Sequence, residues 1–267
     1  MTDIPDHLRS VPARLGVSAR FDDGQLMLDL SPQAATLHHG IVRVSVLSFV
    51  IDAAAGISVD GGQDVWTLTS DLSVRMRPVP APDMVSSTSR VLRQGRRSST
   101  CLVELAAGDG TPVASGAAGF ATIPRRPDDP PKPVMDPERA PEVLSGVADL
   151  ELPLREEAGI EVVDAAEGVV ELTITPELRN PAGTLQGAMV ALVAEAAAED
   201  LVSTRFESPC VVVDLDVRYL AQAHTGPLRT RSRLLGTGPD APVQVELIDT
   251  SADRTTTLVY ARAVPVR

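Results

Sequence analysis

The residues that suggest chemistry stand where a polar loop runs into a long apolar segment in the second half of the chain. Asn180, Pro181 and Gly183 keep the loop out of a helix, because proline and glycine interrupt helices and the residue before a proline avoids helical geometry. Apolar residues then recur at helical spacing from Leu185. The carboxylate of Glu195 lies within this predicted helix on a stripe of small residues, so we expect it to meet a partner segment rather than open water.

A helix start and a carboxylate are two parts that hydrolysis of a carbonyl compound needs. Backbone N–H groups at a helix N-terminus can stabilise a developing oxyanion, and a carboxylate can attack the carbonyl carbon or activate water. Gly187 and Glu195 are eight positions apart, which corresponds to roughly 12 Å along one helix. They cannot both reach one carbonyl group, so the helix start of one unit must meet the carboxylate of another.

The first half of the chain offers a second helix with its own carboxylate. Residues 41–57 form a long apolar run with three consecutive alanines, and its length favours a helix over a strand. Arg43 stands near its start and Asp52 stands late in its length. His38 and His39 precede it in a loop, where we interpret them as solvated or capping residues.

Strand-like segments surround each predicted helix. In the first half, a strand is predicted before the helix at residues 21–30, and four follow it at residues 65–77, 84–92, 100–106 and 113–123. In the second half, a strand pair precedes the helix at residues 161–163 and 169–175. Four more strands follow that helix, at residues 210–220, 228–235, 243–248 and 254–264. Turn-forming residues separate these strands, which predicts antiparallel sheets.

The second half repeats the first. Three pairs of segments match in order and in residue type: residues 28–32 with 172–176, 71–75 with 214–218, and 103–105 with 245–247. Two copies of one module are the most economical explanation. Residues 125–150 are rich in proline and predict a stiff linker. We therefore expect one module at residues 1–124 and a second at residues 151–267.

The composition excludes several classes of protein. The 267 residues carry a formal net charge of −12, whereas nucleic-acid binders need a concentrated basic face. Aromatic residues make up only 3%, too few for base stacking. No apolar run approaches the roughly 18 residues of a membrane span, and the N-terminus does not resemble a signal peptide. The two cysteines are far apart, which indicates small buried side chains and a reducing cytoplasm.

A long helix wrapped by an antiparallel sheet in each half resembles the hotdog fold. The loop and helix start resemble the Asn-x-x-Gly-Thr-x-His-Gly-Gly motif of acyl-CoA thioesterases of the phenylacetic-acid-pathway and 4-hydroxybenzoyl-CoA type. Here the motif runs from Asn180 to Ala188, with Gln186 in place of the histidine, Ala188 in place of the last glycine, and Glu195 at the position of the acid. The resemblance covers both halves, which implies an α+β fold of two tandem hotdog modules paired as a pseudo-dimer.

The resemblance implies composite sites between the two modules. Alignment of the halves pairs three positions: Asp52 with Glu195, Arg43 with Gln186, and Val44 with Gly187. One site then combines Asp52 with Gly187 and Asn180, and we expect this to be the working site. The other combines Glu195 with the region of Arg43 and is expected to be altered. The predicted catalytic residues are Asp52, Glu195, Asn180 and Gly187, and the predicted substrate-binding residues are Gln186, Arg43, Gly183 and Thr184.

The implied activity is hydrolysis of an acyl-CoA thioester to a free acid and CoA. A non-catalytic acyl-CoA-binding or regulatory protein is the alternative, and a hotdog hydratase is disfavoured because neither helix carries a histidine. We expect no metal and no other cofactor, because the four histidines are dispersed. We also expect a homodimer of the whole chain, with no nucleic-acid or membrane partner.

Simpler roles remain open for the charged residues. Glu195 could pair with an arginine across the module interface, and Asp52 could be a structural carboxylate of its helix. Gln186 and Gly187 could form an ordinary helix entry. Arg43 is better explained as an ion-pair partner or a phosphate contact than as a catalyst.

Overall fold

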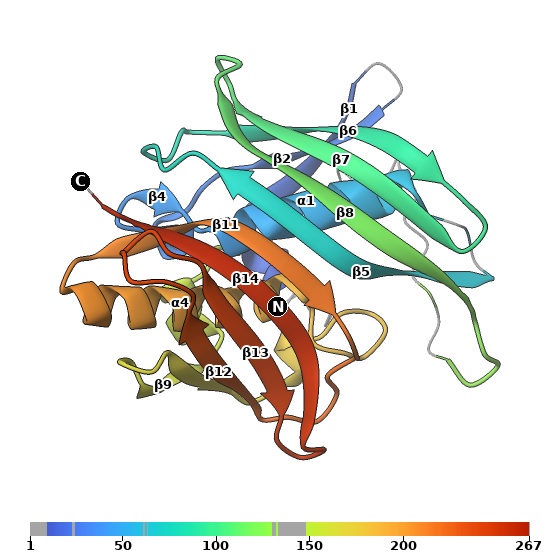
Figure 1. Cartoon of the computed structure of the whole chain (residues 1–267). Coiled ribbons are helices and arrows are strands. Elements are labelled where there is room, and N and C mark those ends of the chain that lie inside the picture. The colour runs from blue at the N-terminus through green and yellow to red at the C-terminus, as the bar shows by residue number, and fades with distance from the viewer. Residues whose placement is uncertain are drawn as a thin grey trace.

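The computed structural model describes residues 10–22, 25–60, 62, 64–129, 132 and 148–266. Twelve antiparallel strands form one continuous sheet, and two long helices pack against the same face of it (Figure 1). Neither helix is long and apolar enough to cross a membrane, in the part of the chain that the structure describes. Both cysteines are buried free thiols, at Cys101 and Cys210.

The N-terminal half supplies six of the twelve strands and the first helix. A hairpin of β1 (Val17–Asp22) and β2 (Gln25–Leu30) comes first, followed by the two-residue strands β3 (Leu37–His38) and β4 (Ile41–Val42). Helix α1 (Val44–Ser58) comes next. The remaining strands are β5 (Val65–Met76), β6 (Val85–Gln94), β7 (Ser98–Ala107) and β8 (Pro112–Pro124).

The C-terminal half follows the same order. It begins with the one-turn helix α3 (Leu154–Glu157) and the pair β9 (Ile160–Asp164) and β10 (Val169–Leu172). Helix α4 (Gly187–Phe206) comes next. The remaining strands are β11 (Cys210–Tyr219), β12 (Leu228–Leu234), β13 (Val243–Asp249) and β14 (Arg254–Pro265).

The strand order of the sheet is symmetric about its centre. The order is β1-β2-β6-β7-β8-β5 in the N-terminal half and β11-β14-β13-β12-β10-β9 in the C-terminal half. Strands β5 and β11 join the halves, and Ser73 pairs with Asp216 at the middle of their ladder. On either side of this pair, Asp71 faces Arg218 and Arg75 faces Asp214. The matched segments 71–75 and 214–218 therefore pair with each other in antiparallel orientation at the centre of the sheet.

Alternation of residue type fixes the faces of these two central strands. Leu72 and Val74 of β5 pair with Val217 and Leu215 of β11, and all four side chains are buried. Side chains one position away face outward, where Arg75 binds Asp216 at 2.7 Å. Because strand side chains alternate between the two faces, the apolar residues lie on the face that carries the helices. The helices α1 and α4 also contact each other.

The predicted antiparallel strands are confirmed, with most ends within two residues of the predicted ones. Two details differ. The predicted strand at residues 21–30 is a hairpin, because a separate strand at Val17–Asp22 precedes its turn. Helix α1 begins at Val44 rather than at residue 41, because His39 and Gly40 adopt left-handed conformations that turn β3 back into β4. Residues 1–9 and most of the proposed linker, residues 130–131 and 133–147, lie outside the described part of the chain.

Candidate active site

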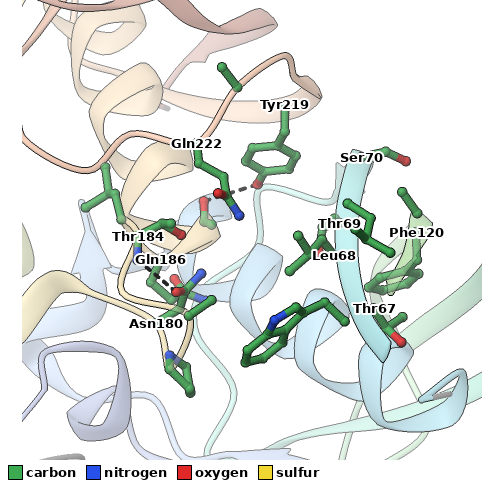
Figure 2. Close-up of a pocket in the computed structure, with 18 of the residues that line it drawn as sticks. Thr67, Leu68, Thr69, Ser70, Phe120, Asn180, Thr184, Gln186, Tyr219 and Gln222 are labelled. Carbon is green, nitrogen blue, oxygen red and sulfur yellow. Dashed lines mark hydrogen bonds between the residues drawn. The ribbon is translucent and has the colours of Figure 1, made fainter. Parts of the chain in front are cut away.

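A cavity of about 860 Å³ lies where the two central strands separate. The β5–β11 ladder ends at Asp71 and Arg218. Beyond it, residues 66–70 of β5 line one side of the cavity, and residues 219–223, from the last residue of β11 onward, line the other. Figure 2 shows these two walls, with Tyr219 and Gln222 on one side and Thr67 to Ser70 on the other. The loop before α4, Asp52 of α1 and the end of β8 with the residues that follow it also contribute to the lining.

The loop that begins at Asn180 is held by its own polar groups. The Oδ1 atom of Asn180 accepts a hydrogen bond from the Thr184 amide at 3.1 Å, and the Asn180 amide donates to the Thr184 carbonyl at 2.8 Å. Gly183 has a φ of +79°, a left-handed conformation that favours glycine. The Leu185 amide then donates to the Ala223 carbonyl at 3.0 Å, which fixes the loop against the wall formed by residues 219–223. The start of α4 is thereby held in place at the cavity.

Gly187 is the first residue of α4 and lies at the cavity surface. The side chain of Gln186 caps the helix by accepting a hydrogen bond from the Ala188 amide. The Tyr219 hydroxyl donates to the Gly187 carbonyl at 3.2 Å. Within the described residues, no acceptor is found for the Gly187 amide. A free N–H at a helix N-terminus is suited to binding a carbonyl oxygen that gains negative charge.

Asp52 reaches this helix start from the other half of the chain. A methyl group on Gly187 would stand 3.4 Å from the Asp52 Oδ2 atom, so the carboxylate lies directly beside the start of α4. The Oδ1 atom of Asp52 accepts a hydrogen bond from the Thr69 hydroxyl at 2.7 Å. Burial raises the pKa of Asp52 to about 6, and the Thr69 hydrogen bond opposes this rise. The carboxylate is therefore mainly ionised at pH 7 and is still basic enough to take a proton.

Glu195 has a different environment on the other side of the helix pair. Its Oε1 atom accepts a hydrogen bond from the Val44 amide at 3.0 Å, and its Oε2 atom accepts one from the Ser45 hydroxyl. Arg43 lies 3.8 Å from Glu195 and binds Glu199 at 2.9 Å. Glu195 is only 1% exposed. Burial, and then the charge of Glu199, raise the pKa of Glu195 to about 7.

The predicted site residues thus fall into two groups. Five of them line the cavity: Asp52, Asn180, Thr184, Gln186 and Gly187. Three do not: Glu195, Arg43 and Gly183. Arg43 is 6% exposed and is engaged by the two glutamates, so its guanidinium is not available to a molecule in the cavity. We therefore leave Glu195, Arg43 and Gly183 out of the proposed working site.

Sequence reasoning missed Thr69 and Tyr219. Thr69 lies two positions before the matched segment 71–75, and Tyr219 comes directly after the matched segment 214–218. Both positions mark the places where β5 and β11 separate. A search for polar side chains among the residues that flank the two matched segments could have found them. Among the described residues, no group of three histidine, cysteine or acidic side chains could hold a metal ion.

No protein-family model matches this chain, and no curated protein does. Solved structures match it over nearly its whole length. The tesB protein of Mycobacterium avium subspecies paratuberculosis is 13% identical with a TM-score of 0.64, and the match covers 96% of this chain and 98% of that one. A protein of unknown function with hot dog fold from Alicyclobacillus acidocaldarius is 14% identical with a TM-score of 0.60, covering 96% and 98%. The chain has the hotdog fold.

An acyl-ACP thioesterase from Bacteroides thetaiotaomicron also matches, at 13% identity and a TM-score of 0.62, over 89% of this chain and 97% of that one. At identities this low, the matches establish the fold and not the activity. The case for an activity therefore depends on the geometry around Asp52 and Gly187.

Proposed function

We propose that this hotdog protein hydrolyses an acyl-CoA thioester in the cavity where β5 and β11 separate. One observation carries the proposal: the Asp52 carboxylate of one half lies beside Gly187 of the other half, whose amide has no acceptor among the described residues, at the surface of a large cavity. The name of one matched structure supports it, since the Bacteroides thetaiotaomicron protein is called an acyl-ACP thioesterase. CoA as the carrier of the acyl group is part of the proposal.

In the proposed reaction, the thioester carbonyl oxygen accepts a hydrogen bond from the Gly187 amide. Asp52 takes a proton from a water molecule while the water oxygen attacks the carbonyl carbon. The oxyanion collapses, the carbon–sulfur bond breaks, and the thiolate takes the proton from Asp52. The products are a carboxylic acid and a free thiol, and Asp52 returns to its ionised form. Thr69 holds the Oδ1 atom, which leaves Oδ2 to face the reacting groups.

The two halves are proposed to be tandem hotdog modules at residues 1–124 and 151–267 that pair as a pseudo-dimer. The symmetric strand order and the β5–β11 ladder support this division. The site would then be composite, with the base from one module and the amide from the other. A phenylacetic-acid-pathway or 4-hydroxybenzoyl-CoA type, a homodimer of the whole chain and a cytoplasmic location stay predictions.

A thiol-release assay over short, aromatic and long acyl-CoAs tests this function. We expect turnover of at least one of these substrates, and we expect Asp52→Asn to lower kcat by at least about a hundredfold. Glu195→Gln is the matched control, because it neutralises the equivalent carboxylate outside the cavity, and most activity should remain. The reverse ranking of the two variants would overturn the assignment. A CoA-dependent rise in melting temperature without turnover of any substrate would support the non-catalytic alternative.

A further inference from the structure

The symmetry of the sheet places a second helix start opposite a second carboxylate. Val44 and Gly187 are the first residues of α1 and α4. Asp52 of α1 lies beside the start of α4, and Glu195 of α4 lies beside the start of α1. The chain therefore contains two arrangements of the same parts, one on each side of the α1–α4 contact.

The two arrangements differ in what the first helical amide binds. Asp52 binds Thr69, and the Gly187 amide is left without an acceptor among the described residues. Glu195 has one more methylene group, and it accepts a hydrogen bond from the Val44 amide at 3.0 Å. In the second arrangement, a carboxylate oxygen of the protein thus stands where a carbonyl oxygen would have to bind.

Neighbouring side chains enclose Glu195 further. Ser45 donates its hydroxyl hydrogen to the Oε2 atom, whereas the equivalent position in α4 is Ala188, which has no such donor. Arg43 replaces Gln186 as the residue before the helix and has no acceptor atom with which to cap it. Its guanidinium instead binds Glu199 at 2.9 Å and lies 3.8 Å from Glu195.

We propose that Glu195 is an internal carboxylate ligand that closes the second site, so that each chain has one working site. The N-terminus of α1, with the Val44 amide and the Ser45 hydroxyl, is then a binding site for a carboxylate group that the chain itself fills. Only the statement that each chain has one working site rests on the proposed function. The occupation of the α1 start by a carboxylate is independent of any activity.

Removal of the Glu195 side chain tests this carboxylate site directly. Glu195→Ala removes a methylene and a carboxylate, which together have the same heavy atoms as acetate. We expect the variant to melt about 5 to 10 °C below the wild type, because buried donors lose their acceptor. Acetate at high concentration should recover part of that loss, whereas acetamide and sodium chloride should not. The wild type and Glu195→Gln should show no acetate-specific gain.

An equal effect of acetate on the wild type and Glu195→Ala, or no effect on either, would overturn the internal-ligand role. If Glu195→Ala does not fold, the wild type gives a second readout. Calorimetric titration with CoA should give one equivalent bound per chain, and two equivalents would contradict a closed second site. Absence of both CoA binding and hydrolysis in the wild type would remove the proposed function, while the acetate experiment would still report on Glu195.

Discussion

Asp52 and Gly187 lie in different halves of the chain but next to each other in the folded structure. A methyl group on Gly187 would stand 3.4 Å from the Asp52 Oδ2 atom and 3.0 Å from the Tyr219 hydroxyl oxygen. An acid, a helix amide and a phenol therefore converge at one end of the cavity. The space between them is limited, so the site depends on the absence of a side chain at position 187.

Gly187→Ala should therefore impair the site without unfolding the protein. Alanine favours a helix over glycine, so the melting temperature should stay equal or rise slightly. The added methyl would crowd Asp52 and Tyr219, and we expect kcat/KM to fall by at least about tenfold. Steady-state kinetics with the best acyl-CoA substrate measures this. The double variant with Tyr219→Phe, which removes the crowded hydroxyl, should recover part of the loss; no loss in the single variant would contradict the proposed role of position 187.

The pH dependence of kcat/KM should report the ionisation of Asp52. The base must be ionised, so kcat/KM should rise with pH through the pKa of Asp52, which burial raises to about 6. Thr69→Val removes the hydrogen bond that lowers this pKa, and the acidic limb should move to higher pH. Thr69→Ser keeps a hydroxyl and serves as the control. An acidic limb in the same position for all three proteins would show that Asp52 is not the group that titrates.

Asn180 offers a test that separates loop structure from substrate contact. Its Oδ1 atom accepts from the Thr184 amide, and Asp in its place would keep that acceptor. Asn180→Asp loses only the side-chain N–H donors and gains a charge. We expect an unchanged melting temperature and a kcat/KM at least about tenfold lower. Asn180→Ala should lose stability as well as activity, and full activity in both variants would exclude a contact between Asn180 and the substrate.

Glu195 should give the fold a pH-dependent stability. Its pKa is raised from 4.5 to about 7 in the folded protein, so the folded state holds this proton more tightly than the unfolded state. The corresponding stabilisation is complete below about pH 4.5 and is lost as the pH rises through about 7. The wild type should therefore lose more melting temperature between pH 5 and 7.5 than Glu195→Gln does. Parallel curves for the two proteins in differential scanning calorimetry would contradict the raised pKa.

The sequence predicts the helices, most strands and the division of acid and amide between the two halves. The eight-residue separation of Gly187 and Glu195 is sufficient for that last prediction, because helix rise is fixed. Thr69 and Tyr219 could not be placed, because their proximity to Asp52 depends on where the β5–β11 ladder ends. The sequence also predicts that the second site is altered. The contacts of Glu195 with the start of α1 could not be predicted, because they depend on one methylene group of reach and on the serine at position 45.

Because β5 and β11 belong to one chain, the two helix-start arrangements can change independently of each other. In a dimer of identical chains, every substitution appears twice, so both sites must change together. Here one chain carries both halves of the sheet, and Asp52 and Glu195 are encoded separately. Each half can therefore accumulate its own substitutions, and dilution of the protein does not separate the acid at position 52 from the amide that it faces.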